Sequence, residues 1–400
     1  MVPEDWESFS LSQLYEFKNG LNADKASYGH GVPFVNVMDI FAADQLFADS
    51  LRGSVAATEK SAREFAVKSG DVLFNRTSET IEEIAFSAVY LDTKPAVFGG
   101  FVIRGRPKSD LVDALYSKYL FKSASFRKEA MKACQGAFRA NIGQKDLAKI
   151  VMTLPPRSEQ AKIAQILSTW DQAIAATERL LENSQQRKKG LMQQLLTGKK
   201  RLPGFEGEWN LYHLGCLFTE RSEIGSKDLP LLSITSNEGV VYQNETGRKD
   251  TSNADKSKYK RVCPGDIGYN TMRMWQGRSS LSDKEGVVSP AYTILTATGK
   301  SDPLFFSYLF KLTKMVHVFY RHSQGLVSDT WNLKFKQFKK ITCRVPGRPE
   351  QSAIAKILVT TDFEINALRV RMNSLKQEKK ALMQQLLTGK RRVNMDREVA

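Results

Sequence analysis

The chain carries a long internal repeat. The segment LMQQLLTGK occurs unchanged at 191–199 and again at 382–390. Aligning the chain with itself at a shift of roughly 191 residues places 154–201 over 345–392 without a gap, and about half of the positions are identical. Both copies must adopt the same local structure, so this repeat constrains the architecture more than any other feature. The sequence therefore predicts a tandem of two similar halves.

Each copy of the repeat predicts one long helix. Pro156 and Pro349 lie where a helix can begin, because the first turn leaves its amides unpaired. Gly198 and Gly389 lie where it can end, because glycine adopts the left-handed cap at low cost. Between these limits, apolar residues recur at alternating steps of four and three, the spacing of a coiled-coil seam. The seam residues are Ile163, Leu167, Trp170, Ile174, Leu181, Leu191 and Leu195 in the first copy, and Ile354, Leu358, Ile365, Leu368, Met372, Leu375, Leu382 and Leu386 in the second.

Polar residues interrupt this seam. Thr177 and Ser184 weaken the first copy, and Lys188 and Lys379 stand at equivalent points of the two copies. At 1.5 Å per residue, such a helix is about 58 Å long. Two such helices could hold two globular parts a fixed distance apart.

The outer face of the helices is repeated as well. Gln193, Gln194 and Lys199 recur in the second copy, although a seam buried in a bundle core would place no constraint on surface positions. Helices that only filled a core would not explain this identity. Two identical outer faces indicate that two copies of the same partner dock on them.

The segments outside the helices form two similar globular parts. We predict globular domains over 1–153 and 202–344, helical spacers over 154–201 and 345–392, and a short charged tail over 393–400. The first domain offers strand-like runs at 33–40, 71–75, 84–91 and 96–104, followed by a helical stretch over 111–132. The expected fold class is α+β, with two pseudo-symmetric globular α/β domains separated by a long antiparallel two-helix coiled coil.

The net charge of +16 narrows the class of partner. So basic a surface favours polyanions, with nucleic acid first and an acidic membrane second, although a basic charge can also serve solubility alone. No apolar run reaches the length of a membrane span and the first residues lack a signal-peptide pattern, so a cytoplasmic location is expected. The four cysteines form no CxxC pair and are expected to be isolated reduced thiols.

Motifs for catalysis by this chain are missing from the sequence. An adenine methyltransferase needs an Asn/Asp-Pro-Pro-aromatic motif, yet Pro155-Pro156 is preceded by Leu154 and followed by Arg157. The four histidines are not at a metal-ligand spacing with carboxylates or cysteines. Asp71 and Asp266 follow glycines, and a Gly-Asp pair before a strand is typical of a turn rather than of a nuclease site. We therefore predict no catalytic residue, no metal site and no cofactor in this chain.

Candidate base-reading residues lie in loops at matching positions of the two domains. Arg and Lys present paired donors to guanine, and Asn and Gln pair with adenine. In the first domain the candidates are Asn75, Arg76, Thr77, Gln135, Arg139 and Asn141. In the second they are Asn270, Arg273, Gln276, Arg278, Gln324 and Ser328, while Lys334 and Lys336 are expected to contact phosphate. The loops correspond in position and differ in content, as reading two different sequences requires.

These features together resemble the specificity (S) subunit of type I restriction–modification systems. The resemblance rests on the repeated Pro-x-Arg-x-Glu-Gln hinge, the helix ending in Leu-Leu-Thr-Gly-Lys, and the Gly-Asp-hydrophobic strand of each domain. It covers nearly the whole chain, and the duplicated order is far more specific than any single motif. In that family each globular part is a target recognition domain that reads one half of a bipartite DNA sequence.

The resemblance also implies partners. Double-stranded DNA would be bound by the chain, two methyltransferase (M) subunits would dock on the helices and hinges, and restriction (R) subunits would join through the complex of two M subunits with one S subunit. S-adenosylmethionine, ATP and magnesium would then belong to partner subunits of a restriction endonuclease and adenine-N6 methyltransferase complex. The candidate docking residues are Arg157, Glu159, Gln160, Leu191, Leu195, Arg348, Glu350, Gln351, Leu382 and Leu386.

Two other functions remain open at this stage. A non-catalytic scaffold or RNA-binding adaptor could use the helices to space two globular parts, and it would show no preference for a bipartite DNA duplex. A self-contained DNA-modifying enzyme is opposed by the missing motifs. Methyl transfer by the purified chain alone would support it.

Overall fold

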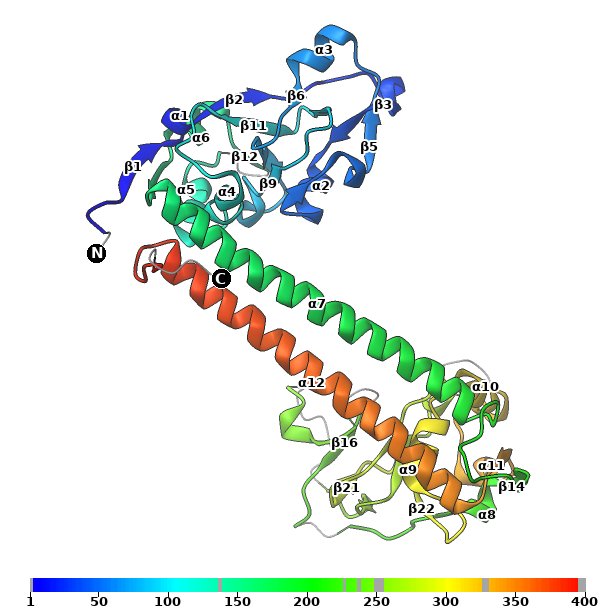
Figure 1. Cartoon of the computed structure of the whole chain (residues 1–400). Helices are drawn as coiled ribbons and strands as arrows, with labels where there is room; N and C mark the ends of the chain where they lie inside the picture. The colour runs from blue at the N-terminus through cyan, green and yellow to red at the C-terminus, as the bar shows by residue number, and fades with distance from the viewer. Residues whose placement is uncertain are drawn as a thin grey trace. The chain divides into compact units, whose positions relative to one another are not determined.

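The computed structural model describes residues 3–135, 139–225, 228–235, 239–247, 255–325 and 331–394. It divides into two compact units (Figure 1). Unit 1 comprises Met1–Thr177 with Arg371–Ala400, and unit 2 comprises Glu178–Val370. Each unit therefore contains one globular part and a half of each long helix. The fold is mixed helix and sheet, as the sequence predicts.

The strands of unit 1 form two main sheets. A five-stranded sheet has the order β2-β11-β7-β9-β4, and a four-stranded sheet has the order β5-β3-β10-β6. Two short pairs, β1-β13 and β12-β8, complete the unit. The strand bounds are β1 Glu7–Ser10, β2 Tyr15–Asn19, β3 Tyr28–Val35, β4 Gln45–Leu46, β5 Gly53–Val55, β6 Ala66–Val67, β7 Val72–Asn75, β8 Thr77–Ser78, β9 Ser87–Tyr90, β10 Ala96–Phe98, β11 Val102–Pro107, β12 Ala140–Asn141 and β13 Val151–Leu154.

Short helices cover one side of the five-stranded sheet of unit 1. Phe74 on β7 packs edge-on against Phe121 at a centroid distance of 4.8 Å, which joins the sheet to the helical layer in one aromatic core. The α-helices are α1 Leu11–Leu14, α2 Val37–Ala42, α3 Glu59–Glu64, α4 Ala114–Leu120, α5 Ala124–Lys132 and α6 Gln144–Lys149, and the 3-10 turns are η1 Lys25–Ser27, η2 Ala48–Ser50 and η3 Ile81–Glu83.

Three of the predicted elements of unit 1 were wrong in detail. The run 96–104 is not one strand, because the chain turns at Gly99 and Gly100 and continues from β10 into β11, which belongs to the other sheet. The run 33–40 is not one strand, because Asn36 caps α2: the amide of Met38 donates to its side chain at 2.7 Å, and its own amide donates to Asp39 at 2.9 Å. Likewise, the stretch 111–132 is not one helix. The hydroxyl of Ser123 accepts a hydrogen bond from the amide of Phe126 at 3.2 Å and begins a second helix there. In the latter two places a short polar side chain competes for the backbone and overrides the apolar pattern.

Unit 2 repeats the framework of unit 1. Its four-stranded sheet has the order β15-β22-β19-β20, which matches β2-β11-β7-β9, and β14 pairs with β23 as β1 pairs with β13. The remaining strands form the pairs β16-β17 and β18-β21. The strand bounds are β14 Asn210–His213, β15 Phe218–Glu220, β16 Leu232–Ile234, β17 Val240–Tyr242, β18 Lys260–Val262, β19 Ile267–Asn270, β20 Ser279–Leu281, β21 Gly286–Val288, β22 Tyr292–Ala297 and β23 Thr342–Val345. The helices are α8 Leu214–Leu217, α9 Pro303–Leu309, α10 Thr313–His322 and α11 Phe335–Phe338, with 3-10 turns η4 Gln243–Glu245 and η5 Met274–Gln276.

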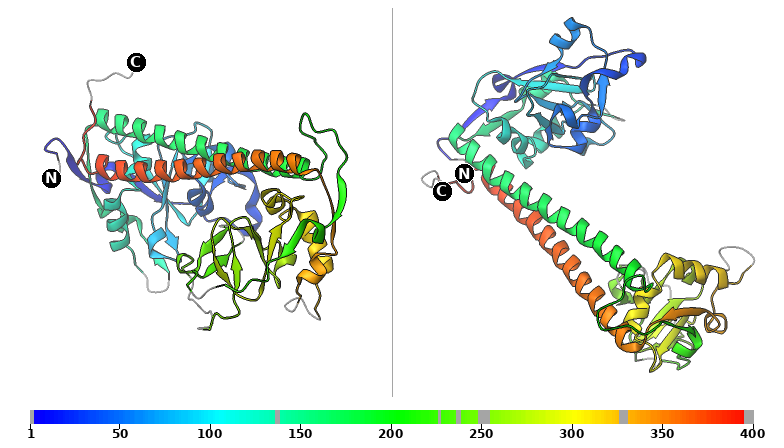
Figure 2. Two further views of the ribbon diagram at one scale, coloured as in Figure 1. Left: turned by 90° about the horizontal axis from the view of Figure 1, so that it is seen from below. Right: turned by 45° about the vertical axis from the view of Figure 1, so that its right-hand side comes forward.

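The two long helices are α7, Arg157–Leu195, and α12, Arg348–Leu386. Both begin at the arginine of the predicted hinge, and the glycines behind their last turns have left-handed φ values of 71° at Gly198 and 70° at Gly389. The predicted starts and stops are therefore confirmed. The helices run side by side in Figures 1 and 2, in antiparallel directions.

The ends of the long helices are buried in the cores of the units rather than only against each other. In unit 1, Ile163 and Leu167 of α7 and Leu386 of α12 join the core beneath the five-stranded sheet. In unit 2, the corresponding ends contribute Leu195 and Leu358. The seam residues at the helix ends therefore pack each globular part against the long helices. In the described part of the chain, no helix is long and apolar enough to span a bilayer.

Candidate nucleic-acid interface and docking helices

The Gly-Asp turns are repeated in atomic detail. The carboxylate of Asp71 accepts a hydrogen bond from the amide of Lys68, and that of Asp266 accepts one from the amide of Cys263, both at 2.8 Å. Each carboxylate also receives two guanidinium bonds, from Arg106 in unit 1 and from Arg221 in unit 2. Both aspartates are almost fully buried. Their predicted role as turn formers is confirmed, and each anchors the strand that leads to a candidate reading loop.

Asn75 and Asn270 end these strands and turn the chain into the loops. The side-chain oxygen of Asn75 accepts from the amide of Thr77 at 3.3 Å, and that of Asn270 accepts from the amide of Met272 at 2.9 Å. Asn75 is fully buried and its amide group also donates to the backbone of Glu83 at 3.4 Å. In this conformation the Asn75 side chain stabilises the loop from its buried side. The Asn270 side chain is half-buried.

Two candidate loops of unit 1, far apart in the sequence, lie side by side. The backbones of Gln135 and Asn141 pair with each other and close a short hairpin. Asn141 also pairs with Thr77 through β12 and β8, and the amide of Ile142 donates to the carbonyl of Arg76 at 3.0 Å. The structure thus brings the loop after β7 and the loop before the first hinge onto one edge of the unit.

The side chains on this edge are accessible. Gln135, Arg139 and Asn141 are exposed, and Arg76 and Thr77 are half-buried. The Gln135 amide donates to the carboxylate of Asp146 at 3.1 Å, which orients it. The other predicted loop positions, 136–138, lie outside the described residues. The exposed set offers one guanidinium and two amides, which are the groups that base edges bind.

Unit 2 builds the same edge from different residues. Gln324 and Asn332 pair as Gln135 and Asn141 do, and the amide of Leu333 donates to the carbonyl of Thr271 at 2.8 Å. Ser328 belongs to this loop but lies outside the described residues. The two candidate loops therefore meet in both units through equivalent backbone hydrogen bonds.

The loop between β19 and β20 spans residues 271–278, against residues 76–86 between β7 and β9, and it carries three of the candidate side chains. Gln276 and Arg278 are exposed together with Gln324, and Arg273 is half-buried. Gly277 adopts a left-handed φ of 76°, which returns the chain toward β20. The predicted phosphate-binding lysines Lys334 and Lys336 are exposed beside this edge, at the start of α11.

An aromatic cluster lies in this edge of unit 2 and was not predicted. Trp275 packs edge-on against Trp331 at 5.5 Å between ring centroids, and Tyr320 packs against Trp331 at 4.9 Å. Tyr320 and the neighbouring Met272 are each more than 40 % exposed. The sequence signal was the pair of tryptophans in the candidate loops themselves. Apolar groups at such an edge can contact thymine methyl groups or bases in the grooves.

The hinge residues were predicted to face a partner, but they are buried, with 1–3 % of each residue exposed: Glu159, Gln160, Glu350 and Gln351. The Gln160 amide donates to the backbone carbonyls of Leu111 and Pro155, both at 2.9 Å. Gln351 makes the equivalent bond to Pro346, also at 2.9 Å. In this conformation both glutamines hold the helix start to the globular part and are not available to a partner.

The hinge glutamates form reciprocal ion pairs. Arg392, behind the end of α12, donates two bonds to Glu159 at the start of α7. Arg201, behind the end of α7, donates two bonds to Glu350 at the start of α12, both at 2.7 Å. These bonds to glutamate raise the pKa of the Arg201 guanidinium. In each unit, one helix end is thus tied to the start of the other helix.

Some of the remaining docking candidates lie on the surface and the others lie in the interior. Arg157 and Arg348 are exposed and donate to backbone carbonyls of the globular part, for example from Arg348 to Gly299 at 3.3 Å. Leu195 and Leu386 are each 2 % exposed and lie in the cores, while Leu191 and Leu382 are partly buried. Among these candidates, the two arginines are the ones whose side chains face solvent.

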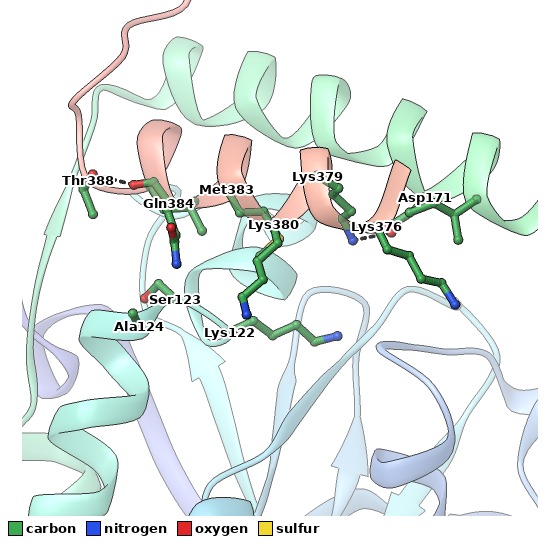
Figure 3. A pocket seen from close by; sticks show the side chains of 12 residues that line it. Lys122, Ser123, Ala124, Asp171, Lys376, Lys379, Lys380, Met383, Gln384 and Thr388 are labelled. Carbon is green, nitrogen blue, oxygen red and sulfur yellow. Dashed lines mark hydrogen bonds and ion pairs between the residues drawn. The ribbon is translucent and has the colours of Figure 1, made fainter. Parts of the chain in front are cut away.

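The lysines that interrupt the seam have a structural role. In unit 1, the Asp171 carboxylate on α7 accepts from the Tyr119 hydroxyl on α4 at 2.7 Å and from Lys379 on α12 (Figure 3). In unit 2, the Asp362 carboxylate on α12 accepts from Tyr308 on α9 at 2.6 Å and from Lys188 on α7 at 2.5 Å. We call each Tyr–Asp–Lys set a latch. Each latch joins the globular part to both helices of its own unit.

The latch of unit 1 contains one more cation. Lys118, whose side chain is 7 % exposed, also donates to Asp171 at 2.7 Å. Burial alone would raise the pKa of the Asp171 carboxyl, but hydrogen bonds from Lys118, Lys379 and Tyr119 outweigh it and hold this pKa below its ordinary value. Asp171 is therefore ionised at neutral pH. The two latches share their plan and differ in their charge.

Comparisons with known proteins show which family model and which relatives resemble this chain. The model of the type I restriction modification DNA specificity domain matches residues 3–183. The chain is 26 % identical over 425 residues to the type I restriction enzyme MjaX specificity subunit of Methanocaldococcus jannaschii, covering 98 % of this chain and 95 % of that protein. It is 23 % identical over 424 residues to the MjaVIII specificity subunit of the same organism, covering 98 % and 94 %.

Solved structures share the fold over the whole length. The S subunit of a type I restriction–modification system from M. genitalium superposes with a TM-score of 0.57 at 14 % identity, covering 95 % of this chain and 96 % of that one. The HsdS subunit from Thermoanaerobacter tengcongensis gives a TM-score of 0.52 at 15 % identity, covering 97 % and 98 %. The resemblance seen in the repeat and hinges is thereby confirmed: the family model, the relatives and the solved structures to which this chain is similar are all of specificity subunits of type I restriction–modification systems.

Proposed function

We propose that this specificity subunit reads a bipartite, asymmetric DNA target, with one half-site for each unit. The observation that carries the proposal is the equivalent meeting of two loops in both units, through the hydrogen bonds of Ile142 to Arg76 and of Leu333 to Thr271. A shared framework with different exposed side chains is what two different half-sites require. Arg139 and Asn141 would read the first half-site, and Gln276 and Arg278 the second.

The long helices would set the distance between the half-sites. Each has 39 residues, and protein geometry fixes half-site spacing in dimeric DNA readers in the same way. The base pairs between the half-sites would then be unread. Exposed lysines beside the loops, such as Lys334 and Lys336, would bind phosphates and make the affinity depend on salt.

The repeated helices and the similarity to specificity subunits support the choice of partners. Two methyltransferase subunits would dock on the repeated faces of the helices, and restriction subunits would join through them. S-adenosylmethionine, ATP and magnesium would bind to those subunits, and this chain would supply recognition without catalysis. A methyltransferase acting on adenine inside a duplex must extrude the base, and the specificity subunit would hold the DNA during that step.

Modified-base sequencing of host DNA, with and without this gene, tests the proposal. We expect N6-methyladenine at one gapped motif with two different halves, and loss of that methylation when the gene is deleted. Restoring the gene should restore the motif. A methylated motif that is continuous, or methylation unchanged by deletion while the chain co-purifies with an active methyltransferase, would contradict bipartite reading by this subunit.

A further inference from the structure

Three aromatic side chains from separate segments of unit 2 meet beside the edge where its candidate loops pair. Trp275 belongs to η5 and Tyr320 belongs to α10. Trp331 lies directly before Asn332, which pairs with Gln324. The ring centroids lie 5.5 Å apart for Trp275 and Trp331, 4.9 Å for Tyr320 and Trp331, and 6.4 Å for Trp275 and Tyr320. All three distances are typical of packed aromatic pairs. We call these three side chains the ring cluster.

The fold does not require the ring cluster, because unit 1 builds the same framework without it. At the position of Tyr320, counted back from the paired glutamine of each unit, unit 1 has Met131. At the position of Trp331, directly before the paired asparagine, it has Ala140. The loops of both units nevertheless meet through equivalent backbone hydrogen bonds. The rings therefore belong to what differs between the two units, and a difference in the bound half-site is the reason to look for.

The ring cluster offers apolar edges rather than hydrogen-bonding groups. The indole N–H of Trp275 donates to the backbone carbonyl of Met272 at 3.0 Å, so it is used inside the loop. The rings meet at interplanar angles of 62–78°, and the edge of one therefore covers part of the face of the next. Tyr320 is 42 % exposed and Met272 is 43 % exposed. Such a surface suits a small apolar group, whereas a stacked base needs an open ring face.

Exposed basic side chains lie on the same three segments as the rings. They are Arg278, Lys314, Arg321, Lys334 and Lys336. In the ranges that the structure describes, no carboxylate pairs with any of them. Basic groups around an apolar centre are complementary to a groove of duplex DNA, because its phosphates flank the bases. The charge therefore identifies DNA as the occupant of this surface.

We propose that the ring cluster reads the C5-methyl group of a thymine in the second half-site, from the major groove. The inference rests on the proposed function and names a group that unit 2 recognises. The thymine methyl is the apolar group that the major groove displays, and it helps to distinguish the four base pairs there. Gln276 and Arg278 lie one and three residues after Trp275 and would bond the neighbouring base edges.

Replacing that thymine by uracil removes the methyl group and leaves every hydrogen-bonding group of the base in place. The expected loss is therefore that of burying one methyl group, which weakens binding about fourfold. Met131 and Ala140 stand at the equivalent positions of unit 1, so the same ring contact is not available to the first half-site.

The test uses the complex of the full chain with its methyltransferase, and duplexes that carry the motif found by modified-base sequencing. Each thymine of either half-site is replaced in turn by uracil, and the dissociation constant is measured without S-adenosylmethionine. Trp331→Ala and Tyr320→Met place the residues of unit 1 into unit 2. Trp331→Phe keeps an apolar ring, and Arg321→Met removes a charge on α10. Thermal unfolding of each variant is measured in parallel, and Tyr320→Met decides if Trp331→Ala does not fold.

We expect uracil at one thymine of the second half-site to weaken binding by the wild type about fourfold. Trp331→Ala and Tyr320→Met should bind thymine and uracil duplexes more nearly alike, and Trp331→Phe should retain the preference. Neither change should alter the effect of uracil in the first half-site. Arg321→Met should weaken binding to both duplexes equally and reduce the dependence on salt, as loss of a phosphate contact does.

Equal binding of thymine and uracil duplexes by the wild type throughout the second half-site would overturn the inference. So would a full thymine preference in both Trp331→Ala and Tyr320→Met, since the methyl group would then be read elsewhere. Unchanged DNA affinity in both variants would assign the rings to a partner other than DNA and would overturn it as well. Failure of the wild-type complex to bind any gapped motif would instead overturn the proposed function.

Discussion

Removing the charge of Asp171 tests how the latch of unit 1 holds the globular part to the helices. In Asp171→Asn, Lys118 and Lys379 lose their counter-charge although their side chains are only 7 % and 17 % exposed. Breaking a buried ion pair costs about 3–5 kcal/mol, and the 29 % exposure of the Asp171 side chain reduces this through solvent screening. We expect unit 1 to lose roughly 2–4 kcal/mol of its stability.

The matched change in unit 2 is Asp362→Asn. The Asp362 side chain is 42 % exposed, and among the described residues it forms an ion pair with Lys188 only, so loss of its charge should cost about 1 kcal/mol. Hydrogen exchange followed by mass spectrometry resolves the two effects, because amides of α4 report on unit 1 and amides of α9 report on unit 2. A single denaturation curve would mix two cooperative units.

A double-mutant cycle identifies the source of the difference. Position 118 of unit 1 corresponds to Ser307 in unit 2, so Lys118→Met should bring the cost of Asp171→Asn close to that of Asp362→Asn. If Asp362→Asn costs as much as Asp171→Asn, or if Lys118→Met leaves the cost of Asp171→Asn unchanged, the assignment of the extra stability to Lys118 is refuted.

The acid stability of unit 1 follows from the same group. The folded-state pKa of Asp171 is depressed below its unfolded value, so its contribution is complete above about pH 4 and is lost as the pH falls through the folded pKa. Wild-type exchange at α4 should therefore accelerate in acid below that pH. Asp171→Asn should remove part of this pH dependence, and an unchanged acid profile in the variant would contradict the assigned pKa direction.

Three further predictions concern recognition, packing and spacing. Arg139→Ala should alter the methylated motif only in the first half-site, and Arg278→Ala only in the second, as read by modified-base sequencing; a change in both halves from either variant would argue against separate reading. Leu386→Ala should destabilise unit 1 by about 2–5 kcal/mol because it leaves a cavity in that core, and exchange should rise in α4 but not in α9. Inserting one heptad at the same depth in both long helices should lengthen the unread gap without changing either half-site, and a motif of unchanged spacing would refute the role of the helices as a ruler.

Much of the framework follows from local sequence. The glycines after the repeated helices end them because a left-handed residue is needed there, and Gly198 and Gly389 confirm this at nearly the same φ. The Gly-Asp turns follow likewise, since the aspartate caps a neighbouring amide in both units. The repeat also indicated the fold class and the resemblance to specificity subunits, because two ungapped copies in a fixed order leave few architectures. The helix ends and the turns depend on residues close together in the chain, and the repeat is visible in the sequence without any contact between its copies.

Tertiary structure decided which side chains face solvent and which loops meet. Gln160 looked like a surface residue of a repeated motif, yet it is buried by carbonyls of a segment almost fifty residues earlier. Lys379 looked like a defect in an apolar seam, yet it completes an ion pair with Asp171 on the other helix. Asn141 and Thr77 lie side by side through strand pairing. Contacts between residues far apart in the chain leave no local pattern in the sequence. Only the folded chain therefore determines which residues are buried, which strands pair and which side chains lie on the edge where the candidate loops meet.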